Sequence, residues 1–133
     1  MKENKLIILI NKSADDIFAF VTTPPNSTRW ISSITKEETN EWPVKIGTIY
    51  KLWDEKNNIS KMKVIDIKNN EMVEWISEDQ NYHCRYVLKI IDKNISEFKY
   101  YEWVDRGIID NPFMQDTLEK LKLVLENQKN SIV

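Results

Sequence analysis

The chain has 133 residues and a formal net charge of −2, with 41% hydrophobic and 30% charged residues. This length and balance fit a single globular domain over residues 1–133, with a core of its own, and exclude a disordered chain. Because there are only two glycines, and because Lys, Asp and Glu are mixed along the chain, a Gly-rich phosphate loop and a nucleic-acid partner are not expected.

The first predicted element is a strand over residues 5–11 (KLIILIN), which are mostly apolar and β-branched. This run is too short for the core of a signal peptide or for a membrane span. Cys84 is the one cysteine in the sequence, which excludes an internal disulfide and fits a reducing compartment. We therefore expect a cytoplasmic protein without membrane insertion.

Two short helices are expected after this strand. Ser13, with a carboxylate three residues later at Asp16, is a helix start, and this helix ends before Pro24. Residues 26–30 are expected to form a second short helix or turn that ends on Trp30.

Six more strands are predicted, separated by short polar turns and one loop. They cover residues 33–41, 48–54, 59–67, 71–77, 82–91 and 95–105. Consecutive hairpins of this kind indicate an antiparallel meander. Because side chains alternate along a strand, Tyr50, Trp75, Tyr86, Tyr100 and Glu102 are expected on one common face.

The last predicted element is a long amphipathic helix from Pro112 to about Lys129. Asn111 is expected to cap its first turn, and Pro112 occupies a position where a missing N–H costs nothing. An apolar stripe recurs at helical spacing and must be buried against the sheet; it consists of Met114, Leu118, Leu121 and Leu125.

Several local patterns accompany this order of elements. They are residues 13–21 (SADDIFAFV), residues 23–26 (TPPN) with Trp30 shortly after, residues 46–48 (IGT) opening a strand, and the leucine-rich final helix. Together they resemble the helix-grip fold of the START/SRPBCC superfamily, particularly its polyketide cyclase/dehydrase and lipid-transfer-like branch. The resemblance covers essentially the whole chain.

The resemblance implies an α+β fold, with a curved antiparallel sheet of about seven strands wrapped around a long C-terminal helix and two short helices after the first strand. It also implies a cavity between sheet and helix that holds an apolar or aromatic small molecule. Members of the superfamily include lipid carriers, hormone receptors, aromatases and cyclases, and chaperone activators, so the fold leaves the function open.

The residues needed for a metal site or a nucleophile pair are scarce. His83 and Cys84 are the one histidine and the one cysteine, and as neighbours on a strand they point to opposite faces. We therefore expect no zinc site and no Cys–His pair. The sequence also lacks GxSxG, Walker and dinucleotide-binding motifs, so no cofactor is expected and catalysis stays open.

Glu102 is the candidate catalytic residue. Alternation puts it beside Tyr100 and toward the helix, where a desolvated carboxylate suits a general acid or base. The alternative is a structural carboxylate near the strand end, bonded to Arg106 or to a tyrosine hydroxyl.

The candidate ligand-binding residues are large side chains expected near the cavity, together with one carboxylate: Trp30, Tyr50, Trp75, Tyr86, Tyr100, Glu102, Met114 and Leu118. The alternative is that these side chains fill a solid core.

The sequence therefore predicts binding of a hydrophobic or aromatic small molecule in an internal cavity. One alternative is an enzyme, resembling a polyketide cyclase or dehydratase, that uses Glu102 or a tyrosine for proton transfer. Another is a protein-interaction module of the chaperone-activator type, whose interior would be filled. A homodimer hypothesis rests on Trp53, Tyr101 and Trp103, which with Ile49 are expected to face outward.

Overall fold

The computed structural model of the protein describes residues 1–128. Seven antiparallel strands form one sheet in the order β1-β7-β6-β5-β4-β3-β2. In chain order they are β1 (Glu3–Ile10), β2 (Lys36–Thr39), β3 (Ile49–Trp53), β4 (Ile59–Lys68), β5 (Met72–Ser77), β6 (Tyr82–Asp92) and β7 (Ile95–Val104). The predicted meander and the α+β class are confirmed.

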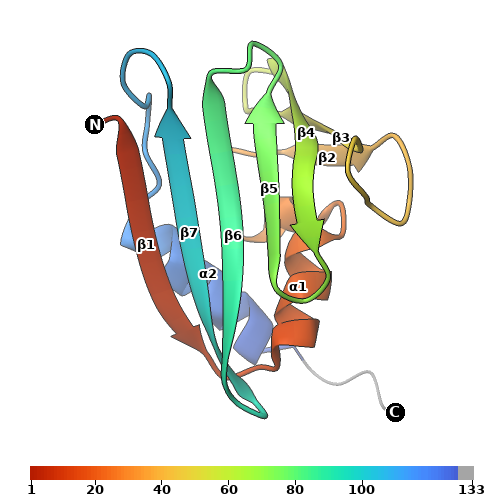
Figure 1. Ribbon diagram of the computed structural model, residues 1–133, viewed down its shortest axis with the longest axis vertical. Coiled ribbons are helices and arrows are strands. Elements are labelled where there is room, and N and C mark those ends of the chain that lie inside the picture. Colours follow the sequence, from red (N-terminus) through yellow and green to blue (C-terminus); the bar gives the residue numbers. More distant parts are fainter. Residues whose placement is uncertain (129–133) are drawn as a thin grey trace.

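The helices are α1 (Ala14–Thr22), the short 3-10 helix η1 (Asn26–Arg29) and α2 (Gln115–Glu126). Figure 1 shows α1 and α2 behind the sheet, on the same face, and β2 and β3 turned across behind β4. The Ser13 hydroxyl accepts a hydrogen bond from the Asp16 amide at 3.2 Å, so the predicted start of α1 is confirmed. Within residues 1–128, no helix is both long enough and apolar enough to cross a membrane.

The core lies between the inner face of the sheet and the helices. In β7 every second side chain is buried, including Phe98, Tyr100 and Glu102, which is the alternation that the sequence predicts. From α2 the buried side chains are Leu118, Leu121 and Leu125. This helix packs mainly along β1.

The start of the last helix is wrong in the sequence prediction. The helix begins at Gln115 rather than Pro112, and Asn111 adopts a φ of 52° instead of capping it. The backbone of Phe113 is held away from helical geometry by two hydrogen bonds: its N–H donates to Glu102 at 2.8 Å, and its carbonyl accepts from Asn4 at 2.9 Å. Tertiary contacts therefore override the Asn-Pro start signal. The expected end at Lys129 lies outside the described residues.

Candidate functional site

A pocket of about 520 Å³ opens on the inner face of the sheet. Strands β2 to β7 contribute residues to it, with Glu37 coming from β2. It is bordered by η1, by the segment that follows η1 as far as Ile34, and by residues 110–113. Among the described residues, none that line it belongs to α2. The cavity that the sequence places between sheet and C-terminal helix is therefore displaced toward η1 and the segment before α2.

Aromatic rings form much of the pocket wall. Trp75 packs edge-on against Tyr50, with ring centroids 5.5 Å apart, and against Tyr86 at 4.8 Å. On the other side, the Phe113 ring stacks on Tyr100 at 4.3 Å with an interplanar angle of 7°. The Tyr50 hydroxyl donates to the Thr22 carbonyl at 2.6 Å, which ties β3 to the end of α1.

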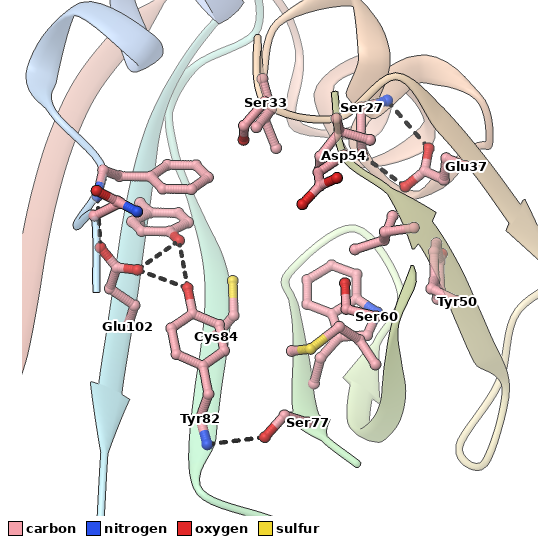
Figure 2. A pocket seen from close by; sticks show the side chains of 18 of the residues that line it. Ser27, Ser33, Glu37, Tyr50, Asp54, Ser60, Ser77, Tyr82, Cys84 and Glu102 are labelled. Carbon is pink, nitrogen blue, oxygen red and sulfur yellow. Dashed lines mark hydrogen bonds between the residues drawn. The ribbon is translucent and has the colours of Figure 1, made fainter. Parts of the chain in front are cut away.

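At one end of the pocket Glu102 is 1% exposed and accepts four hydrogen bonds. Its Oε1 accepts from the hydroxyls of Tyr82 at 2.6 Å and Tyr100 at 3.2 Å. Its Oε2 accepts from Asn4 Nδ2 and from the Phe113 amide, each at 2.8 Å. Figure 2 shows this network on the side of the pocket opposite Glu37. With both oxygens occupied, the carboxylate joins β1, β6 and β7 to the segment before α2.

At the opposite end Glu37 is 6% exposed and has fewer partners. Its two oxygens accept from the Ser27 amide at 3.1 Å and the Ser27 hydroxyl at 2.7 Å (Figure 2). Burial raises the pKa of the Glu37 carboxyl, and the two bonds from Ser27 offset part of that rise. Glu37 is therefore a buried acid in the pocket wall with free lone pairs on both oxygens.

The predicted ligand-binding residues divide into three groups. Those that line the pocket are Tyr50, Trp75, Tyr86, Tyr100 and Glu102. Trp30 and Leu118 are buried in the core instead, Trp30 with its ring 5.9 Å from that of Tyr86. Met114 was expected at the cavity but is 66% exposed, because it is the extended residue before α2 and points away from the side that Phe113 occupies.

The predicted ligand-binding residues omit several that line the pocket, among them Glu37, Tyr82 and Phe113. Glu37 lies in the strand KEET, where neighbouring charges give no apolar alternation to indicate the buried face. Phe113 follows the apparent helix start at Pro112, which hides its extended conformation. Tyr82 does fall on the inner face by alternation, and that signal alone identifies it.

His83 and Cys84 point to opposite faces of β6, as expected. Cys84 lines the pocket, and burial raises the pKa of its thiol. His83 lies on the outer face, where its ring stacks on Trp103 at 4.8 Å and its Nε2 is 3.0 Å from an Asp105 carboxylate oxygen.

Comparison with known proteins identifies the architecture through solved structures; no protein-family model and no curated protein matches the chain. The protein XoxI from Bacillus cereus superimposes with a TM-score of 0.76 at 10% identity, covering 96% of this chain and 97% of that one. The Aha1 dimer from Colwellia psychrerythraea gives 0.75 at 18% identity, covering 98% and 100%.

A third similar structure is the di-domain ARO/CYC BexL from the BE-7585A biosynthetic pathway. Its TM-score is 0.64 at 12% identity, and the match covers 78% of this chain but 36% of BexL. At these identities the likeness concerns the fold. The chain therefore has the helix-grip fold, a curved antiparallel sheet with its long helix at the C-terminal end.

Proposed function

We propose that this chain binds a hydrophobic or aromatic small molecule in the pocket between the sheet and the segments around η1 and Phe113. The observation that carries the proposal is an open pocket of about 520 Å³ walled largely by aromatic rings. Small-molecule sites usually enclose about 300–1,000 Å³ and combine apolar walls with a few polar groups. The aromatic rings around Trp75 supply the apolar wall, and the Glu37 carboxyl supplies a polar group.

Membership of the START/SRPBCC superfamily, and of its polyketide cyclase/dehydrase and lipid-transfer-like branch, is part of the proposal. The likeness in fold to BexL and to Aha1 supports it. The open pocket favours a ligand carrier over an interaction module of the chaperone-activator type, whose interior we expect to be filled.

Filling the pocket tests the proposal. In Cys84→Phe a ring would project from β6 into the open space, whereas Val87→Phe adds the same ring to the outer face of the same strand. We expect lipophilic aromatic compounds to raise the Tm of the native chain and of Val87→Phe but not of Cys84→Phe. Equal shifts in all three proteins, with circular dichroism showing all three folded, contradict binding at this pocket.

Catalysis is the second candidate function, and the two acidic ends of the pocket favour it. The raised pKa of Glu37 suits a general acid, and Glu102 bonded to two tyrosine hydroxyls remains the candidate predicted from sequence. If the chain is a cyclase or dehydratase, a ligand incubated with it should lose water, and Glu37→Gln or Glu102→Gln should slow that loss. Mass spectrometry that recovers only unchanged ligand contradicts catalysis on that ligand.

A second copy of the chain is a further proposed partner. Tyr101 and Trp103 lie on the outer face, as the hypothesis requires, and the similar Aha1 structure is a dimer. However, Lys5 lies 5.4 Å from the Tyr101 ring centroid and Arg85 lies 5.1 Å from that of Trp103. These cations cover part of the rings, so a contact between copies would have to extend onto Ile7 and Leu9, which are about half exposed on the same face of β1.

A further inference from the structure

The charged residues that line the pocket are all acidic. They are Glu37, Asp54, Glu102 and Asp110; among the described lining residues there is no Lys, Arg or His. Within residues 1–128, none of these four carboxylates forms an ion pair. An apolar pocket with this charge disfavours a bound anion, because the carboxylates would repel it and no basic group would compensate its lost hydration.

Glu37 is the carboxylate with capacity for a ligand. Glu102 already accepts four hydrogen bonds, whereas each Glu37 oxygen accepts one, both from Ser27. The groups around Glu37 are Tyr50 from β3, Asp54 after β3 and Tyr86 from β6, and none of them is basic. Hydrogen bonds from Asn58 and Lys56 hold the pKa of Asp54 below its usual range, so Asp54 stays ionised near the same end. Figure 2 shows Asp54 and Glu37 at one end of the pocket.

The Tyr86 hydroxyl is a second polar group that is open to this end of the pocket. Tyr86 is 6% exposed and lines the pocket, yet no hydrogen bond joins its hydroxyl to any of the described residues. The charge of Glu37 is close enough to contribute to the raised pKa of Tyr86, after burial and the larger effect of Cys84. The unpaired hydroxyl and the under-occupied carboxylate therefore face the same space.

Aromatic side chains line much of the rest of the pocket. Seven aromatic residues line the pocket: Tyr50, Trp53, Trp75, Tyr82, Tyr86, Tyr100 and Phe113. The electron-rich face of an aromatic ring attracts an organic cation, and the attraction strengthens where water is excluded. Acidic side chains and aromatic rings without a basic residue are the combination that suits an ammonium group on an apolar body.

We propose that the ligand of this pocket is a lipophilic or aromatic amine, bound as the cation with its ammonium group between Glu37, the Tyr86 hydroxyl and the rings of Tyr50 and Trp75. This inference rests on the proposed function and narrows it. The ammonium donates to the free lone pairs of Glu37 and to the Tyr86 oxygen, while its apolar body fills the space toward Phe113. A fatty acid or another anionic lipid would find no counterion there.

Three probes of equal shape separate the charge of a ligand from its apolar body: naphthylmethylamine, naphthylmethanol and naphthoate. We expect calorimetry at neutral pH to show the amine binding at least about tenfold more tightly than the alcohol. The carboxylate should bind most weakly. This comparison uses the native chain and does not depend on any variant folding.

Substitutions then test whether Glu37 is the residue that causes the preference for the amine. Glu37→Gln should bring the affinity for the amine to within about twofold of that for the alcohol, because the variant lacks the negative charge that favours the cation. A tenfold change in affinity corresponds to about 1.4 kcal/mol. Glu38→Gln is the matched control on the same strand, because Glu38 is exposed and lies 3.4 Å from Lys36 on the outer face. It should change neither affinity.

The outcomes distinguish the two proposals. If the alcohol or the carboxylate binds as tightly as the amine, or if Glu37→Gln leaves the preference for the amine intact, the cation inference is wrong and the pocket remains a lipophile site. If no probe and no lipophilic compound binds the native chain, the proposed function fails, and the cation inference fails with it.

Discussion

Glu37 and Glu102 are buried carboxylates in one pocket, but their surroundings give them different roles. Four donors from β1, β6, β7 and the segment before α2 surround Glu102, so it holds those parts together. Glu37 has one residue, Ser27, as its donor and an apolar neighbourhood that raises its pKa. The first arrangement stabilises the fold, and the second is kept at a cost in free energy.

The cost at Glu37 should appear as a dependence of stability on pH. The native state holds a proton on Glu37 more tightly than the unfolded chain, where the group titrates near 4.5. The contribution of Glu37 is therefore most favourable below pH 4.5 and falls as the pH rises through its raised native pKa. The other titratable groups near Glu37 do not change their charge over this pH range. Asp54 is ionised because its pKa is lowered, and Tyr50 and Tyr86 are neutral because burial raises the pKa of each.

Glu37→Gln should lack this fall in stability. We expect urea unfolding to show the variant gaining stability relative to the native chain as the pH is raised from 4.5 toward neutral. A difference that does not change with pH would contradict a raised pKa at Glu37.

A second prediction at the scale of residues concerns the hydrogen-bond donors that the Glu102 carboxylate accepts from. Glu102→Leu leaves the Phe113 N–H and one N–H of the Asn4 amide without an acceptor, while the other N–H of that amide still donates to the Phe113 carbonyl. The hydroxyls of Tyr82 and Tyr100, 3.1 Å apart, can still pair with each other. At about 1–3 kcal/mol for each of these two donors, the free energy of unfolding should fall by about 2–6 kcal/mol. The control is Glu97→Leu, on the outer face of the same strand and 3.6 Å from Lys99, which should cost about 1 kcal/mol or less. Equal losses would contradict the structural role of Glu102.

At the scale of elements, α2 is amphipathic, with one face buried and one in solvent. Leu121 is fully buried, whereas Leu123 is 61% exposed two positions later. We expect Leu121→Ala to lower the free energy of unfolding by about 2–5 kcal/mol, from lost burial and the cavity left behind. Leu123→Ala should change it by no more than about 0.5 kcal/mol. Similar values in denaturant unfolding would show that α2 is not packed as described.

The limits of sequence reasoning are clearest in the segment before α2. Periodicity identifies the buried leucines correctly, since each helical turn brings the stripe back to the same face. The Asn-Pro pair also looks like a helix start, but the amide of Phe113 bonds to Glu102 and its carbonyl to Asn4, residues 11 and 109 positions away. No local pattern encodes partners so distant. The same contacts send Phe113 toward the pocket and leave Met114 in solvent.

At the scale of the whole molecule, alternation and turn chemistry predict the sheet because they are local properties of each hairpin. They yield the order of β2 to β7, the antiparallel pairing of these strands and the buried face of β7, but not the pairing of β1 with β7. The pocket is harder to predict, because its walls come from η1, six strands and residues 110–113. Whether these meet closely or leave space depends on the volume of many side chains at once, and Glu37 enters the wall from a strand without a clear apolar face.

The prediction at this scale concerns the oligomeric state of the protein. If two copies pair through the outer face, light scattering at micromolar concentration should give twice the chain mass of 15.9 kDa. Replacing Ile7 and Leu9 with Lys should restore the single-chain mass, because two charges would then be buried against the partner. A native mass near 15.9 kDa contradicts the homodimer hypothesis.

The position of Trp75 has a practical consequence. Its indole forms part of the pocket wall, edge-on to Tyr50 and Tyr86, so an occupant would change the polarity around it and shift its fluorescence emission. Exchanging Trp42, Trp53 and Trp103 for Phe would leave Trp75 and the deeply enclosed Trp30, whose signal should stay constant. The chain thus carries an intrinsic optical reporter with which candidate compounds can be titrated without any label.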